Sequence, residues 1–88
     1  MSVQASEIEA ALSAALDPSE LQVRDDSHLH AGHAGALEGR HFSVRIVSAR
    51  CAGLNRVARH RLVDDALQSL IPRGIHALAI DARAPGEP

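Results

Sequence analysis

Histidines are the residues whose number and spacing first suggest chemistry, since six occur among 88 residues. Three of them, His28, His30 and His33, share one glycine-containing segment. A His-x-His-x-x-His segment can wrap a transition metal, because imidazole is a ligand for Zn, Ni, Cu or Fe. No Cys pair or carboxylate completes the set as in a zinc finger. A solvated histidine loop is therefore the alternative interpretation of the same spacing.

Two further histidines stand in predicted secondary structure. His76 opens the otherwise apolar run 75–80, where a half-buried imidazole bonded to a neighbouring carbonyl is the ordinary interpretation. His60 lies between Arg59 and Arg61 early in a predicted helix. That position is typical of a residue at a helix surface or at an interface.

The other reactive side chains do not form a catalytic set. Cys51 is the only cysteine, so it can form neither an intrachain disulfide nor a Cys-x-x-Cys redox pair. Ser27 beside His28, and Ser48 near Cys51, would need an orienting third group in a preformed cleft. No Walker or dinucleotide-binding glycine pattern occurs. We therefore predict that the protein is not an enzyme.

Length and composition indicate one small domain. A chain of 88 residues, 45% of them hydrophobic, fits a single domain with a thin stability margin. The N-terminus lacks a basic region, and Glu7 and Glu9 interrupt its apolar run, which is not the pattern of a signal peptide. No stretch approaches the ~20 apolar residues of a membrane span. We expect a cytoplasmic protein without membrane contact.

Charge is unevenly distributed along the chain. All nine basic residues are arginine, and six of them lie between positions 40 and 61, whereas six of the eleven acids lie in the first 26 residues. A basic stripe of this kind can meet phosphate, although genomic base composition explains an all-arginine choice equally well.

Periodicity predicts the element order α-β-β-α-β. The first helix is predicted from an apolar stripe at helical spacing and ends at Asp17-Pro18. Ser6 and Glu9 form a capping box at its start, although Ser2 could start the helix a turn earlier. The stripe consists of Ile8, Ala11, Leu12 and Ala15. Strands are predicted at 21–24 and 41–48, joined as a hairpin by the long histidine loop. Loops above ~12 residues are often functional.

The residues after position 40 predict a strand with one apolar face and then a helix. Phe42, Val44 and Ile46 alternate with His41, Ser43 and Arg45, so the first three share a face. A helix is expected from Arg56 to Leu70 or Ile71, capped by Asn55 and stopped by Pro72, with Arg59, Asp65 and Gln68 facing water. Its buried stripe would be Leu62, Val63, Ala66, Leu67 and Leu70.

These elements predict an α+β fold with both helices on one face of a three-stranded mixed sheet. The run 75–80 forms the third strand, and the helical crossover makes it parallel to the second. We expect a single domain over residues 1–83 and a flexible C-terminal tail over 84–88.

The chain resembles the BolA family over nearly its whole length, and four segments carry the resemblance. They are Asp25-Asp26-Ser27 with His30, the strand His41 to Ser48, Arg59-His60-Arg61-Leu62-Val63, and Ile75-His76-Ala77-Leu78. The resemblance implies a class-II KH-like fold. It also implies a role as partner of a monothiol glutaredoxin, in iron–sulfur trafficking or iron-linked regulation.

In that family the two proteins bridge a 2Fe–2S cluster, with glutathione as a ligand on the glutaredoxin side. The resemblance assigns one ligand to His76 and the second to the loop, at His30, with His33 next. Some members carry a loop cysteine; this loop has none, so the chain resembles the histidine type. The isolated protein is expected to be a metal-free monomer.

The chain departs from the family at Cys51, where an aromatic residue usually stands, and at its short C-terminus. We interpret Cys51 as a small hydrophobic residue in the place of that aromatic. The competing function is a KH-like transcriptional regulator that binds DNA through the arginine-rich 40–61 segment. Against it, no Gly-x-x-Gly loop occurs. A metal-free adaptor is the third alternative. In each case Arg59, His60 and Arg61 are the predicted partner or nucleic-acid interface.

Overall fold

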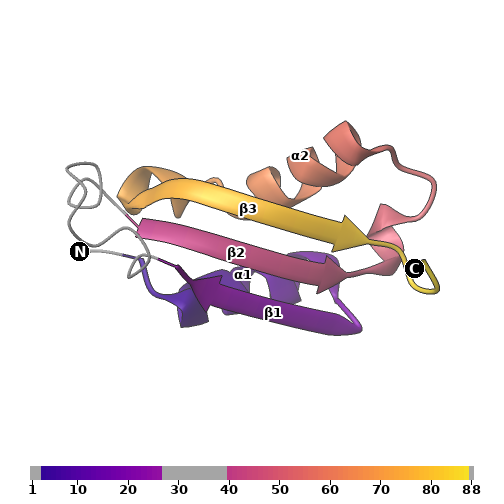
Figure 1. Cartoon of the computed structure of the whole chain (residues 1–88), viewed down its shortest axis with the longest axis horizontal. Helices are drawn as coiled ribbons and strands as arrows, with labels where there is room; N and C mark the ends of the chain where they lie inside the picture. The colour runs from indigo at the N-terminus through magenta and orange to yellow at the C-terminus, as the bar shows by residue number, and fades with distance from the viewer. Residues whose placement is uncertain (1–2, 27–39, 88) are drawn as a thin grey trace.

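The structure, a computed structural model, describes residues 3–26 and 40–87. Its elements follow the predicted order (Figure 1). They are α1 (Ala5–Leu16), β1 (Glu20–Asp25), β2 (Arg40–Val47), η3 (Ala49–Cys51), α2 (Arg56–Ala66), η4 (Ile71–Arg73) and β3 (Ile75–Arg83), where η marks a 3-10 turn.

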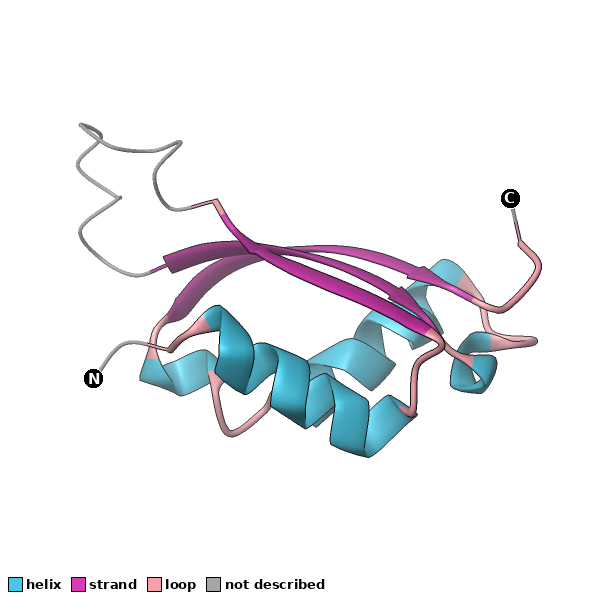
Figure 2. Cartoon of the chain, turned by 90° about the horizontal axis from the view of Figure 1, so that it is seen from below, coloured by secondary structure: helices cyan, strands magenta, loops and turns pink. Residues whose placement is uncertain are grey.

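The three strands form one sheet in the order β1-β2-β3. β1 runs antiparallel to β2, as expected of a hairpin, and β2 runs parallel to β3. Both helices cover the same face of the sheet (Figure 2). The predicted α+β fold with a mixed sheet is therefore confirmed. Among the described residues, no helix is long and apolar enough to cross a membrane.

The core lies between the sheet and the two helices. Phe42, Val44 and Ile46 are buried on the helix-covered face of β2, as the alternation predicts. They pack with Ile8 and Leu12 of α1 and with the apolar stripe of α2. Phe42, the only aromatic residue, is 2% exposed.

One polar side chain is buried at the far end of β2. The hydroxyl of Ser48 donates to the carbonyl of Leu16 at 2.6 Å and accepts from the backbone N–H of Arg50 at 3.1 Å. Because each of its polar contacts is a hydrogen bond, the burial of this hydroxyl is compensated. Ser48 thus joins the end of α1 to the start of η3.

α1 starts earlier than the sequence indicates. Its N-cap is Gln4, and the carboxylate of Glu7 accepts from the Gln4 N–H at 2.8 Å, so the predicted Ser6–Glu9 capping box is wrong. Leu16 is the buried end of the stripe and Ala15 is exposed, because Leu16 stands four residues after Leu12.

α2 begins as predicted and ends early. The Asn55 side chain caps it by accepting from the N–H of Ala58 at 2.9 Å. The helix ends at Ala66 rather than at Leu70, and a turn followed by η4 continues the path. Pro72 within η4 has no N–H for a helical bond. The predicted stripe is still buried or half-buried, since a turn over 67–70 keeps Leu67 and Leu70 on the core side.

The C-terminal segment differs from the expected flexible tail. β3 extends to Arg83, three residues beyond the predicted end, and residues 84–87 form a turn. Ala84 is buried and its N–H donates to the Glu87 carboxylate at 2.6 Å. Glu87 also binds Arg59, so the segment through residue 87 is held against α2. Pro88 lies outside the described residues.

Candidate functional site

His76 occupies an irregular position in the parallel β2–β3 pair. Arg40 pairs with Ile75 and His41 pairs with Ala77, so His76 has no residue opposite it on β2. An extra residue of this kind is a β-bulge, which interrupts the regular pairing. The structure therefore places His76 in a strand, as predicted, and at the one register shift between β2 and β3.

The segment that carries the loop histidines begins and ends beside this bulge. His28, His30 and His33 lie outside the described residues, but Asp26 and Arg40, which flank segment 27–39, are described. Arg40 pairs with the residue before His76, and the N–H of Asp26 donates to the carbonyl of His41 at 2.7 Å. The topology therefore brings both ends of the histidine segment to the end of the sheet that holds His76.

Asp26 fixes this end of the sheet. Its carboxylate accepts a hydrogen bond from the hydroxyl of Ser43 and another from Nε of Arg24, at 3.0 Å. The Asp26 side chain is only 14% exposed, but that of Arg24 is 68% exposed, so the bond to Ser43 is the better shielded of the two. The carboxylate ties β1 to β2 at the point where segment 27–39 leaves the sheet.

A shallow hollow of about 260 Å³ adjoins the same end. Its lining includes Asp26, His41 and Ser43 from the hairpin and Ala77 and Ala79 from β3. Because the side chains of the two alanines are short, they leave a depression beside the bulge, on the face of β3 that the helices do not cover. Within residues 3–26 and 40–87, no group of three or more possible metal ligands occurs.

Cys51 lies at the opposite end of the sheet. It lies in η3, shortly after Val47, the last residue of β2, whereas His76 adjoins Arg40, the first residue. The eight residues of β2 span roughly 23 Å. The thiol is fully buried. Burial raises its pKa above the usual value, while the Arg59 guanidinium opposes that shift and the Glu87 carboxylate adds to it. Cys51 therefore behaves as the predicted small hydrophobic residue, far from the histidines.

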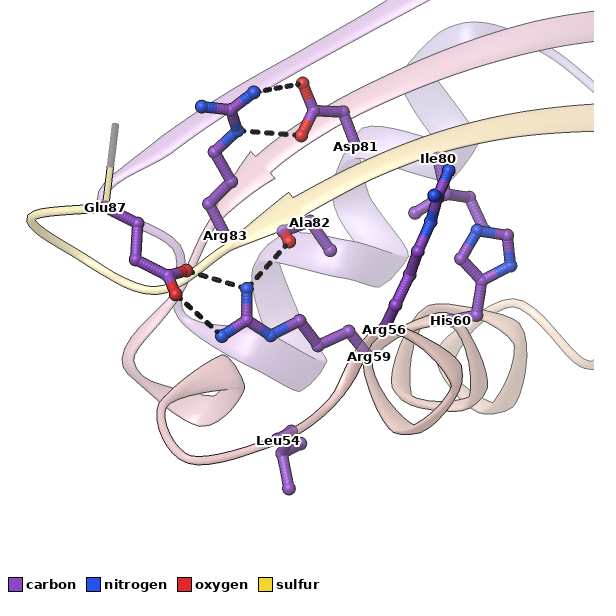
Figure 3. A pocket seen from close by; sticks show the side chains of 9 residues that line it. All are labelled: Leu54, Arg56, Arg59, His60, Ile80, Asp81, Ala82, Arg83 and Glu87. Carbon is purple, nitrogen blue, oxygen red and sulfur yellow. Dashed lines mark hydrogen bonds and ion pairs between the residues drawn. The ribbon is translucent and has the colours of Figure 1, made fainter.

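Arg59 is bound within the domain, so the prediction that it faces water is wrong. Its two terminal nitrogens bind the Glu87 carboxylate at 2.7 and 2.9 Å, and one also donates to the carbonyl of Ala82 at 3.3 Å (Figure 3). The side chain is only 16% exposed. The hydrogen bonds from Arg59 and from the Ala84 N–H lower the pKa of Glu87 to about 2.

Its neighbours in the predicted interface remain accessible. His60 is half-buried and Arg61 is exposed. His60 lines an open cleft of about 670 Å³ between α2 and the second half of β3. The cleft is lined by Leu54, Arg56, Arg59, His60, Ile80, Asp81, Ala82, Arg83 and Glu87 (Figure 3).

Three features of these sites were not predicted from the sequence. Glu87 was assigned to a tail because Pro85 and Gly86 precede it; the same Pro-Gly pair is a turn signal that could have indicated a return of the chain. The pairing of Asp26 with Ser43 requires the hairpin register, and the bulge at His76 requires the β2–β3 register. No local sequence signal reports either.

Two helices on one face of a mixed three-stranded sheet place the chain in a class of small α+β domains. The model of the BolA-like protein family matches residues 12–87. The chain belongs to the BolA family.

Relatives and solved structures agree over nearly the whole chain. An uncharacterized protein in the cobS 5' region of Sinorhizobium sp is 46% identical over 84 residues, which cover 92% of this chain and 90% of that protein. The BolA domain of SufE1 from Arabidopsis thaliana superposes with a TM-score of 0.85 at 44% identity, covering 100% of this chain and 99% of that one. The DNA-binding transcriptional regulator BolA of Vibrio cholerae is 45% identical over 73 residues, 83% of this chain and 67% of that protein.

Some relatives are much longer than this chain. It spans 55% of the chloroplastic protein BOLA1 and 21% of SufE-like protein 1, both from Arabidopsis thaliana. The similarity is therefore to their BolA portion.

Proposed function

We propose that this protein binds a monothiol glutaredoxin and co-ligates a shared 2Fe–2S cluster through His76 and a histidine of segment 27–39, His30 first and His33 next. The protein acts as a binding partner in iron–sulfur trafficking or iron-linked regulation and not as an enzyme. A glutaredoxin cysteine and glutathione supply the ligands on the other side. Without the cluster the protein is a cytoplasmic monomer.

The observation that carries this proposal is the position of the bulge at His76. Parallel pairing of β2 and β3 puts the start of β3 beside Arg40, where the histidine segment re-enters the sheet. A ligand fixed by a strand and a ligand from the adjoining segment can therefore approach one site from the same end of the sheet.

The donors at this end suit the proposed group. Imidazole is an accepted ligand of 2Fe–2S iron, and its neutral form raises the reduction potential relative to a thiolate ligand. Such a nitrogen must be deprotonated to bind, so ligation should weaken in acid. The cluster, when bound, supplies one-electron chemistry or a transferable iron–sulfur unit. Cys51 is buried at the opposite end and does not enter the ligand set.

Reconstitution with the glutaredoxin tests the proposal. The apo-protein is mixed with a monothiol glutaredoxin, glutathione, iron and sulfide, and the product is examined by gel filtration and by visible circular dichroism. We expect a heterodimer whose spectrum differs from that of the glutaredoxin homodimer, and we expect His76→Ala to lose that difference. Glu9→Gln is the control, because Glu9 is exposed on α1, outside the predicted interface, and its substitution should leave the spectrum intact.

An unchanged homodimer spectrum together with separate elution of the two proteins would refute the cluster proposal. Complex formation without iron would favour the metal-free adaptor instead. The far-ultraviolet circular dichroism of the His76→Ala protein must match that of the wild type, so that a lost cluster spectrum reflects a lost ligand and not a lost fold.

DNA binding is the second candidate, because one relative is named a DNA-binding transcriptional regulator. Arg45, Arg50, Arg56 and Arg61 are exposed and can meet phosphate. Phe42 is buried, however, and offers no stacking platform to a base. The surface thus favours contacts with the DNA backbone over reading of sequence.

Salt dependence separates the two candidates. Phosphate contacts alone should give weak binding to duplex DNA that falls steeply as salt rises and does not distinguish sequences. Fluorescence anisotropy with two unrelated duplexes measures this. Tight binding to one duplex near physiological salt would make the regulator the better proposal.

A further inference from the structure

The outer edge of β3 is a second place where a partner can bind. β3 pairs with β2 on one side only. The carbonyl of Arg83 accepts from the N–H of Ser48 at 2.9 Å, so the backbone groups of Arg83 face β2. Because the backbone groups of successive strand residues point to alternate sides, those of Ile80 and Ala82 point away from β2.

Three of the four outward backbone groups of Ile80 and Ala82 have no hydrogen-bond partner among the described residues. The carbonyl of Ala82 accepts from Arg59 at 3.3 Å. No hydrogen bond from the described part of the chain reaches the N–H or carbonyl of Ile80 on this side, or the N–H of Ala82. A row of unpaired groups at a sheet edge is a template on which an extended peptide can pair as an added strand.

There is room beside this edge for such a segment. A cleft lies between the edge and α2. Its volume of about 670 Å³ is within the range of roughly 300–1,000 Å³ usual for ligand sites. Leu54 and Ile80 supply apolar surface within its lining. The edge is therefore not closed off by α2 at this point.

The charges of the cleft indicate the kind of segment that fits. Both of its carboxylates are already held, Asp81 by Arg83 at 2.9 Å and Glu87 by Arg59 at 2.7 Å. Arg56 makes no hydrogen bond or close ion pair with a described residue, and it acts on Asp81 only at longer range.

Arg56 and His60 line the cleft together with Ile80 (Figure 3). His60 is also without a hydrogen bond to any residue in the described ranges. An uncompensated guanidinium next to unpaired backbone groups attracts a carboxylate on the incoming segment.

We propose that the outer edge of β3 binds an extended acidic peptide segment of a partner protein. The segment pairs with the backbone of Ile80 and Ala82 and places a carboxylate at Arg56. This surface lies toward the end of β3 opposite to His76, so the proposal does not depend on cluster binding.

A synthetic peptide serves as the probe. Its length is about eight residues, the size of an ordinary strand, with alternating glutamate and valine, and a lysine–valine peptide is the charge control. Titration into the ¹⁵N-labelled full chain is followed by amide chemical shifts. We expect the acidic peptide, at up to roughly 1 mM, to shift and protect the amides of Ile80 and Ala82, and we expect the lysine peptide to leave them unchanged.

Two variants separate charge from backbone pairing. Arg56→Glu should weaken binding by about tenfold or more, and it should fold, since an acidic residue suits the first turn of a helix. Arg50→Glu makes the same charge change on exposed η3 and should bind like the wild type. Ala82→Pro removes the outward N–H without removing a bond to β2, and it should also bind weakly.

Several outcomes would overturn the proposal. They are the absence of shifts at Ile80 and Ala82, equal binding of the lysine peptide, and equal losses in Arg56→Glu and Arg50→Glu. Shifts caused by an oligothymidylate but not by the acidic peptide would identify a nucleic-acid surface instead. A concentration-dependent dimer that protects the same amides would show that a second copy of the chain occupies the edge.

Discussion

At the scale of single residues, His76 and the histidines of segment 27–39 differ in their sequence neighbours. His76 stands in a strand, where Ile75 and Ala77 on either side are paired with β2. His28, His30 and His33 follow one another closely in a segment that also contains Gly32 and Gly35. One loop histidine can therefore replace another at some entropic cost, whereas no neighbour can replace His76.

This difference predicts an asymmetry between two substitutions. His30→Ala should weaken or alter the cluster spectrum and leave a partial signal, because His33 or His28 can bind instead, whereas His76→Ala should abolish it. Visible circular dichroism of the glutaredoxin complex measures both. A silent His76→Ala combined with complete loss in His30→Ala would mean that the loop alone ligates the cluster.

Cys51 gives the second prediction at this scale. Cys51→Ser should cost about 1–3 kcal/mol, because a hydroxyl would be buried in the place of a weakly polar thiol. Cluster formation should be unchanged, since Cys51 lies at the end of the sheet opposite to His76. Urea unfolding and the same reconstitution measure the two effects. Loss of the cluster with an intact fold would contradict the assignment of Cys51 as a packing residue.

At the scale of elements, Arg59 joins three parts of the chain. It extends from α2 and binds the β3 edge at Ala82 and the C-terminal turn at Glu87. The contact occupies only the carbonyl of Ala82, so the N–H of Ala82 and the backbone groups of Ile80 stay open at the sheet edge. Its Nε is buried without a hydrogen-bond partner among the described residues, which marks the site as incompletely satisfied.

The Arg59–Glu87 pair makes stability depend on pH in a defined direction. The folded pKa of Glu87, about 2, lies below its ordinary value of 4.5. Such a group stabilises the fold fully above its unfolded pKa, and this contribution is lost as pH falls from about 4.5 to about 2. Glu87→Gln should therefore be less stable than the wild type near neutral pH, and the difference should shrink in acid. Glu9→Gln, on exposed α1, is the control.

Chemical denaturation at several pH values measures this difference. Because the Glu87 side chain is 39% exposed, salt should screen the pair and reduce the effect. A difference that stays constant from neutral pH to below a pH of about 3 would exclude the ion pair as its source.

The elements also show where sequence reasoning succeeds. The alternation in β2, the Asn55 cap and the stripe of α2 were predicted because each depends on residues within a few positions of one another. Arg59 was predicted to face water, because its ion-pair partner Glu87 stands 28 positions away in the sequence. Helical spacing alone gives no indication of so distant a partner. The bulge at His76 could not be predicted either, because it depends on pairing between strands that are distant in the sequence.

At the scale of the whole molecule, the described core and the proposed cluster ligands come from different residues of the chain. The described core is made by α1, α2 and the inner face of the sheet, and neither His41 nor His60, the histidines whose side chains are described, belongs to it. The overall fold could be predicted from apolar periodicity because that pattern belongs to the core. The proposed metal site depended on a family resemblance, since its candidate donors follow no periodic pattern.

This separation predicts that cluster binding can be removed without unfolding the domain. Substitution of His28, His30 and His33 by alanine together should change the free energy of unfolding by no more than about 0.5 kcal/mol. The same variant should form no cluster with the glutaredoxin. Thermal unfolding of the apo-protein and reconstitution are the two measurements. A large loss of stability would show that the segment contributes to the folded domain.

The burial of Phe42 as the only aromatic residue has a consequence for spectroscopy. With no tryptophan or tyrosine, the chain is nearly transparent in the near-ultraviolet, where aromatic side chains otherwise report tertiary packing. In a mixture with any protein that contains tryptophan, absorbance and fluorescence in this region come from the other component. Titrations can therefore be read as the response of the partner alone, and a fluorinated phenylalanine at position 42 would add a single signal from the centre of this domain.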